Sequence, residues 1–146
     1  MKFFFSYVAW NVHEPFKGKY SFTGDNDLVK FIKLAQKNDL LVILRPGPYI
    51  SADWEYGGFP YWVMREFTPS GLRTHDDSFM ILMERWLSVL FTKLRPLLYE
   101  NGGPIISLQV CNLYTNSKCL YQIKAQNGCY RKRSIFIEST LYMALS

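Results

Sequence analysis

The sequence is poor in the residues that bind metal ions or form disulfides. It contains three cysteines (Cys111, Cys119 and Cys129) and two histidines, without a C-x-x-C pair or the spacing of a metal site. An odd number of cysteines defines no disulfide framework, so cysteine usage does not indicate a compartment. We expect no metal ion and no cofactor.

Long apolar runs are also missing. No stretch approaches the roughly 18 to 20 apolar residues that a membrane span needs, and we expect no membrane span. The apolar start of the chain ends at Trp10, and no small-residue cleavage site follows it. We therefore interpret this start as a β-strand and not as a signal peptide.

The net charge of +5 is unevenly distributed. Residues 115–146 hold five basic side chains against one acidic side chain, so the part before them is close to neutral. This distribution argues against a nucleic-acid partner, because nucleic-acid binding uses basic side chains clustered on one face of the folded protein. We interpret the basic segment as a solvated tail; the alternative is a binding patch at Arg131, Lys132 and Arg133.

The apolar pattern predicts alternating strands and helices. Strands are expected over 3–10, 41–44 and 105–110, with a short apolar piece at 61–64. A helix capped by Asp25 or Asn26 is expected to bury Leu28, Phe31, Ile32 and Ala35. A second helix, starting at Asp76 or Asp77, carries an apolar stripe from Phe79 to Leu94 and ends before Pro96. This order predicts an α/β fold with a parallel sheet.

Polar and aromatic residues follow all three expected strands. They are Trp10 to Glu14 after the first strand, Arg45, Tyr49, Asp53, Trp54 and Glu55 after the second, and Cys111 to Tyr114 after the third. In parallel α/β folds the functional residues gather at the carboxyl ends of the strands. Amides, carboxylates and aromatic rings together suit a carbohydrate, whose hydroxyls need hydrogen bonds and whose ring faces are apolar.

Several long motifs occur in order along the chain. They are Y-V-x-W-N-x-H-E-P at 7–15, L-R-P-G-P-Y-I at 44–50, W-E-x-G-G-x-P at 54–60 and LRPLLYENGGPII at 94–106. With these motifs, residues 7–114 resemble the family 35 glycoside hydrolases, the β-galactosidases. The resemblance implies a (β/α)₈ TIM barrel, of which this chain would hold about strands two to four with their crossover helices, since a complete barrel needs roughly 200 residues or more. We expect residues 1–114 to be a partial catalytic barrel and residues 115–146 to be a divergent basic tail.

The resemblance also implies a reaction, the retaining hydrolysis of terminal non-reducing β-D-galactose residues. The acid/base Glu of the family lies in a V-E-N-E-Y-G motif, which here reads Val110-Cys111-Asn112-Leu113-Tyr114-Thr115. Leu113 occupies the acid/base position, and Cys111 replaces the Glu two residues earlier. The nucleophile of the family would lie on a later strand, beyond the end of this chain. We expect the chain to be inactive; the alternative is a non-catalytic degenerate fragment or a weak galactose-binding remnant.

Three positions match the substrate contacts of the family. Tyr7 and Asn112 match residues that contact galactose, and Asp53 replaces a Glu there. A galactoside is therefore the partner that the resemblance implies, and the family suggests a lysosomal, vacuolar or extracellular location. The sequence indicates no oligomeric state. Because half a barrel leaves sheet edges and apolar surface uncovered, we expect a marginally stable or aggregation-prone chain.

Other residues at the strand ends allow two interpretations each. His13 and Glu14 are interpreted as a structural pair that holds the following loop, with catalysis as the alternative. Trp10 and Trp54 either stack on sugar or pack in the core. Arg45 either contacts substrate or makes an internal salt bridge, which we favour.

Two further hypotheses are set aside. Asp53 and Glu55 lie only two residues apart on an irregular loop, which gives no geometry for a substitute carboxylate pair. Cys111 has no neighbouring histidine in the sequence to activate it as a nucleophile.

Overall fold

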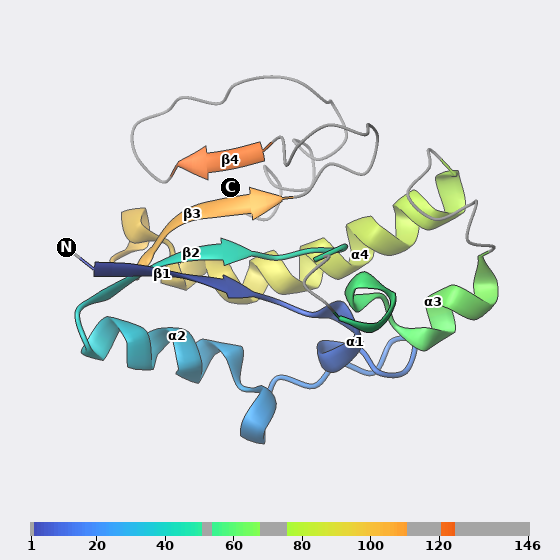
Figure 1. Cartoon of the computed structure of the whole chain (residues 1–146), viewed down its shortest axis with the longest axis horizontal. Helices are drawn as coiled ribbons and strands as arrows, with labels where there is room; N and C mark the ends of the chain where they lie inside the picture. The colour runs from blue at the N-terminus through green and yellow to red at the C-terminus, as the bar shows by residue number, and fades with distance from the viewer. Residues whose placement is uncertain (1, 51–53, 68–75, 111–120, 125–146) are drawn as a thin grey trace.

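The computed structural model describes residues 2–50, 54–67, 76–110 and 121–124. Its centre is a four-stranded sheet in the order β1-β2-β3-β4, made of Lys2–Tyr7, Leu40–Arg45, Ile105–Val110 and Tyr121–Lys124 (Figure 1). The first three strands are parallel, and β4 pairs antiparallel with β3. The parallel α/β class is confirmed. The described strands form an open sheet, so closure into a barrel stays a prediction.

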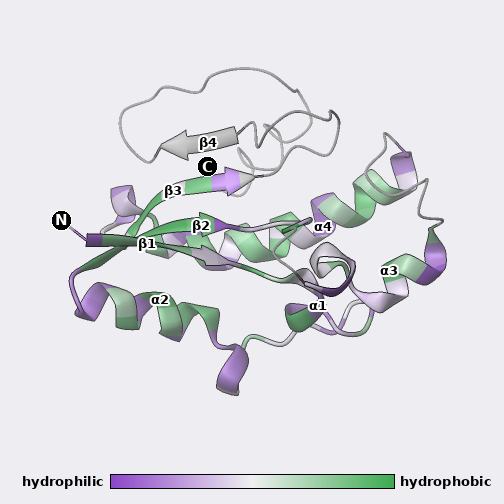
Figure 2. Ribbon diagram, in the orientation of Figure 1, coloured by the Kyte–Doolittle hydropathy of each residue, from purple (hydrophilic) through white to green (hydrophobic). Residues whose placement is uncertain are grey.

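Two long helices lie between the parallel strands in the chain, α2 (Leu28–Lys37) between β1 and β2, and α4 (Asp77–Leu94) between β2 and β3. The shorter elements are helices α1 (Trp10–His13) and α3 (Tyr61–Glu66) and the 3₁₀ turns η1 (Gly24–Asn26), η2 (Glu55–Gly58), η3 (Arg95–Leu97) and η4 (Tyr99–Asn101). In Figure 2, hydrophobic and hydrophilic colour alternate along α2, as expected for a helix with one buried face.

The helices and one face of the sheet share a single core cluster. Val42 and Leu44 of β2 are fully buried in it, together with Ile32 of α2 and Trp86 of α4. The predicted apolar stripe of α4 is confirmed, since eight of its residues from Phe79 to Leu94 are buried. Pro96 lies in η3, where it ends the α-helical geometry as expected.

The opposite face of the sheet carries exposed aromatic rings. Because side chains alternate along a strand, Phe3, Phe5 and Tyr7 lie on one face of β1, with exposed fractions of 57%, 53% and 41%. Their register partners in β2 are Leu41, Ile43 and Arg45. This face therefore ends, at the carboxyl edge, in Tyr7 and Arg45.

Three sequence predictions about elements were wrong in detail. The first strand ends at Tyr7 and not at residue 10, because Trp10 begins α1. Helix α2 is capped by Asp27, whose side chain accepts from the Lys30 backbone N–H, and not by Asp25 or Asn26. Phe31 is 47% exposed and packs edge-on against Phe4.

Strand β4 was not predicted. It lies within the segment 115–146, in which the structure describes only residues 121–124. The expected boundary at residue 114 lies outside the described residues and stays a prediction.

Candidate functional site at the carboxyl edge of the sheet

One side chain from each parallel strand meets at the carboxyl edge. Tyr7 of β1 pairs in register with Arg45 of β2, and the Arg45 guanidinium donates a hydrogen bond to the Tyr7 hydroxyl. Arg45 Nε donates to Gln109 Oε1 of β3 at 2.7 Å. The guanidinium carbon also lies 5.3 Å from the Phe5 ring centroid and 5.1 Å from that of Tyr7. A hydrogen-bonded array thus crosses all three parallel strands.

This array gives the described hydrogen-bond partners of Arg45, which are the neutral side chains of Tyr7 and Gln109. The predicted internal salt bridge stays a prediction, because Asp53, on the loop after β2, lies outside the described residues. Two aromatic faces also lie beside the charge of Arg45, and they attract a cation through the negative charge above the ring.

Trp54 stands beside this edge on the loop after β2. Its indole N–H donates to Asn11 Oδ1 at 3.1 Å, and its side chain is 47% exposed. Trp54 is therefore about half exposed, and a hydrogen bond joins its indole N–H to Asn11 of α1. Trp10, by contrast, is fully buried and stacks on Trp86 at 5.8 Å, so sugar stacking by Trp10 was the wrong alternative.

The glycines of the W-E-x-G-G-x-P motif shape the same loop. Gly57 has φ +63°, and a Cβ placed there would lie 1.9 Å from Tyr49 Cε2. The Gly57 carbonyl accepts from the Ile50 backbone N–H at 2.8 Å, which closes the loop. Gly57 allows both the left-handed backbone and the close approach of the Tyr49 ring.

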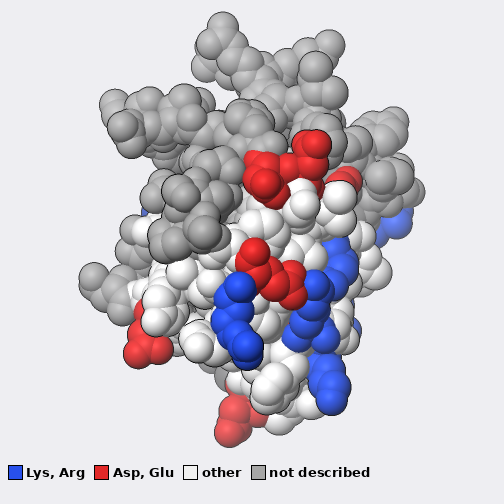
Figure 3. Space-filling model, turned by 90° about the vertical axis from the view of Figure 1, so that its right-hand side faces the viewer, with Lys and Arg blue, Asp and Glu red and all other residues white. Residues whose placement is uncertain are grey.

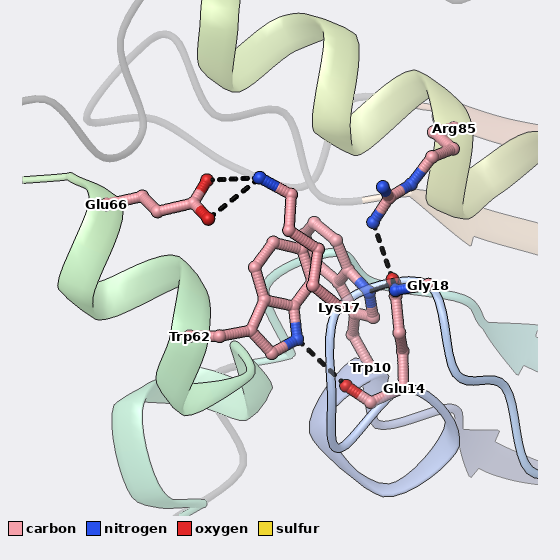
Figure 4. A network of polar contacts seen from close by, with 7 residues as sticks. All are labelled: Trp10, Glu14, Lys17, Gly18, Trp62, Glu66 and Arg85. Carbon is pink, nitrogen blue, oxygen red and sulfur yellow. Dashed lines mark hydrogen bonds and ion pairs between the residues drawn. The ribbon is translucent and has the colours of Figure 1, made fainter.

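Glu14 is the centre of a buried polar network behind the edge (Figure 4). Its carboxylate is fully buried and accepts from Trp10 Nε1 at 2.6 Å, the Gly18 backbone N–H at 2.7 Å and an Arg85 guanidinium nitrogen at 2.5 Å. The Glu14 backbone carbonyl accepts from Trp62 Nε1 at 3.1 Å. Trp62 and Arg85 hold the segment after β1 against α3 and α4, so the structural interpretation of Glu14 agrees with the geometry.

His13 has a similar structural role. Its Nδ1 lies 2.9 Å from the Ser21 carbonyl oxygen, and because a carbonyl only accepts, Nδ1 is the nitrogen that carries hydrogen. The imidazole also stacks on Phe22 at 4.7 Å. Burial lowers the pKa of His13, and the bond to Ser21 partly opposes this effect.

Burial also raises the pKa of the Tyr20 hydroxyl, with a further contribution from the Glu14 carboxylate.

The surface toward which the parallel strands point carries mixed charge. Figure 3 shows acidic and basic side chains interspersed on this face. One pair is Lys17 and Glu66, joined at 2.8 Å, and the Lys17 ammonium lies 5.6 Å from the Trp62 ring centroid. On this face the described residues form no extended patch of one sign.

Several predicted site residues lie outside the described residues. They are Asp53, Cys111, Asn112 and Leu113. Their roles stay predictions, as does the rejected pairing of Asp53 with Glu55, whose described member is exposed at the start of η2. Of the predicted substrate-contact residues, the structure therefore places Tyr7.

The sequence analysis did not predict the roles of Gln109 and Arg85. Gln109 and Ser107 lie two residues apart in a strand that is otherwise apolar, so they share one face of the strand. This period of two could have indicated a face with polar residues. Arg85 interrupts the apolar stripe of α4, but nothing in its spacing indicates that it reaches Glu14, which is 71 residues away in the sequence.

The described residues show neither a metal site nor a membrane span. Within these ranges, no three His, Cys, Asp or Glu side chains are grouped so that they could hold a metal ion. No helix among them has the length and apolar character to cross a bilayer.

Comparison with known proteins identifies the family. The model of the glycosyl hydrolases family 35 matches residues 1–144. The chain is 53% identical over 108 residues to the mouse protein named Beta-galactosidase, and 50% identical over 109 residues to the human protein of that name. It is 52% identical over 108 residues to Beta-galactosidase 17 of Arabidopsis thaliana. These alignments cover 74–75% of this chain but 16% of each relative. The motif-based resemblance is confirmed: this chain belongs to family 35 of the glycosyl hydrolases.

Proposed function

We propose that this chain is a segment of a β-galactosidase-type catalytic domain that binds terminal β-linked galactose without hydrolysing the glycosidic bond. The observation that carries the loss of hydrolysis is Leu113, which stands where the family motif V-E-N-E-Y-G has its acid/base Glu. Membership of the family supports the substrate class. The matched part is 16% of the mouse relative named Beta-galactosidase, so the activity of a whole protein is part of this proposal.

The chemistry explains why one side chain is decisive. Retaining hydrolysis uses two carboxyl groups roughly 5–5.5 Å apart, one as nucleophile and one as the acid that protonates the leaving oxygen. Leucine has no ionisable proton, so the leaving group would depart without general-acid help, which is worth about 10²–10⁴ in rate. Neither Arg45 nor Gln109 carries a carboxyl group that could replace it.

Three features support retained sugar contact. Tyr7 lies at the carboxyl edge with 41% of its surface exposed, where its hydroxyl can reach a ligand. Trp54 offers an exposed ring near Asn11, and an indole face suits the apolar face of a pyranose. Asp53 and Asn112 are proposed to add a carboxylate and an amide for the sugar hydroxyls.

A turnover assay tests the loss of hydrolysis. We expect the purified chain to release no nitrophenol from p-nitrophenyl β-D-galactoside above the rate in buffer. Tyr7→Phe is the matched control for contamination, since a host enzyme in the sample would be unaffected by this substitution. Turnover by the wild-type chain that falls in Tyr7→Phe would contradict the proposal.

The competing function is that of an inert product with neither activity nor sugar binding. The same Leu113 substitution favours it, because a site without catalysis is free to lose its contacts. Equilibrium binding of a galactoside separates the two, since only the proposed function expects a saturable titration.

A further inference from the structure

We infer that Arg45 is a positioning residue, which holds the Tyr7 hydroxyl as a hydrogen-bond donor toward a bound galactoside. This inference rests on the proposed function, because it concerns how the same edge recognises its sugar. It goes further by assigning a direction to the Tyr7 hydrogen bond and a role to Arg45 and Gln109.

The direction follows from the donor inventory of the two side chains. A guanidinium carries only donors, whereas a phenol carries one donor and an acceptor oxygen. In the contact between Arg45 and Tyr7, the phenol oxygen must therefore accept. The O–H of Tyr7 then points away from Arg45 and is available to donate to a hydroxyl oxygen of the ligand. Arginine stays charged in proteins, so this polarity persists wherever the chain is folded.

The orientation of Arg45 is itself fixed from two directions. Gln109 Oε1 accepts from Arg45 Nε at 2.7 Å, which fixes one edge of the planar guanidinium. The Phe5 ring supports its face at 5.3 Å from the guanidinium carbon. A planar group with one edge bound and one face supported keeps little freedom, so its remaining N–H groups present a defined direction to Tyr7.

The register explains why these residues meet. Tyr7 and Arg45 are partners in the parallel pair of β1 and β2, and Leu44 pairs with Leu108 one residue before Arg45 and Gln109. The three side chains therefore occupy one level and one face of the sheet. Tyr7 is on the edge strand and 41% exposed, so its hydroxyl is the part of the array that a ligand can reach.

A double-mutant cycle on the full chain tests the inference. The probe is methyl β-D-galactoside, titrated by NMR into the wild-type chain, Arg45→Met, Tyr7→Phe and the double variant. We expect Arg45→Met to weaken binding about five- to tenfold, the loss of one hydrogen bond of ordinary strength. In the Tyr7→Phe background the same substitution should change binding less than about twofold, because Arg45 acts through the hydroxyl.

Two further variants serve as controls. Arg65→Met makes the same change of charge and length at an exposed position of α3, and we expect it to leave binding unchanged. Gln109→Met keeps Arg45 but removes its tether, and we expect a loss of about twofold, smaller than the effect of losing the whole hydrogen bond. Gln109→Met also keeps the inference testable if Arg45→Met fails to fold.

The outcomes separate the two proposals. Equal losses for Arg45→Met in the wild-type and Tyr7→Phe backgrounds would overturn the inference while leaving galactoside binding intact. Unchanged binding in Arg45→Met, or in Gln109→Met when Arg45→Met is unfolded, would overturn it as well. Absence of a titration in the wild-type chain would instead overturn the proposed function, and the inference with it.

Discussion

Among single residues, the buried carboxylate of Glu14 gives the H-E-P motif a structural role that requires no catalytic function. A fully buried charge is costly unless it is paired and hydrogen-bonded. Glu14 has three donors, from Trp10, Gly18 and Arg85, on two helices and a loop. The motif therefore stabilises the base of the carboxyl edge, and its glutamate is bound to three donors and not available as a general acid.

Substitution of Glu14 tests this structural role. Glu14→Gln keeps the shape of the side chain but leaves Arg85 without its counter-charge, so we expect the free energy of unfolding to fall by about 3 kcal/mol. Glu66→Gln is the control, because Glu66 and Lys17 form an ion pair with side chains 39% and 48% exposed, for which less than about 1 kcal/mol is expected. Urea unfolding measures both. Equal losses in the two variants would refute a special role for Glu14.

His13 gives a prediction about pH. Because burial lowers its pKa in the folded state, the unfolded chain binds a proton first as the pH falls. The contribution of neutral His13 to stability is therefore complete above about pH 6.5, the ordinary pKa of histidine, and is lost progressively below it. Thermal unfolding between pH 7.5 and 5 should show a smaller decline in His13→Gln than in the wild-type chain. An equal decline in His13→Gln and in the wild-type chain would speak against His13.

Among the secondary-structure elements, the apolar periodicity of the sequence predicted the long amphipathic helix but not the end of the first strand. Helix α4 was predicted with its start at Asp76 or Asp77, of which Asp76 is the cap, and with its buried stripe, because an apolar face that repeats over several turns fits a helix and not a strand. The end of β1 was not predictable, since the run from Phe3 to Trp10 is apolar or aromatic apart from Ser6. Trp10 is buried after the chain has left the sheet, and burial alone does not distinguish a strand from a helix.

The candidate site was also predicted only in part from the sequence. The sequence indicated which residues follow the strands, and Tyr7 and Arg45 do lie together at one edge. Sequence spacing could not predict the contacts of Arg45 with Gln109 or of Glu14 with Arg85, because they depend on register and helix packing across 64 and 71 residues. The favoured salt bridge of Arg45 stays a prediction, because Asp53, on the loop after β2, lies outside the described residues.

The close approach of Gly57 and Tyr49 in the loop after β2 can be tested by substitution. Gly57→Ala adds a Cβ that would lie 1.9 Å from Tyr49 in a left-handed backbone, and we expect a loss of about 3 kcal/mol in stability. Gly24→Ala is the control, since Gly24 has φ +62° but no atom within 4 Å of the added Cβ. It should cost about 1 kcal/mol, the backbone strain alone. Similar losses in urea unfolding would show that the Tyr49 contact contributes nothing.

At the scale of the whole molecule, the sheet is covered by helices on one face and exposes aromatic rings on the other. Phe3 and Phe5 lie on the edge strand β1, 57% and 53% exposed. An edge strand with an apolar face favours pairing with other chains. This arrangement supports the expectation that the isolated chain associates.

A charge on β1 should reduce this association. We expect Phe3→Lys to lower the concentration-dependent self-association of the chain, measured by sedimentation velocity, because lysine disfavours edge pairing. Ile81→Lys is the matched control, since Ile81 is 64% exposed but belongs to helix α4 and not to the edge strand. A wild-type chain that sediments as a monomer at all concentrations would contradict the expectation.

We propose that this member of family 35 recognises a galactoside although Leu113 stands at the position proposed for its acid/base residue. The most direct measurement is a titration of the purified chain with galactose, followed by tryptophan fluorescence, because the exposed indole of Trp54 lies beside the carboxyl edge. We expect a saturable change in fluorescence that is weakened or lost in Tyr7→Phe. A signal that stays flat up to high millimolar galactose would contradict it.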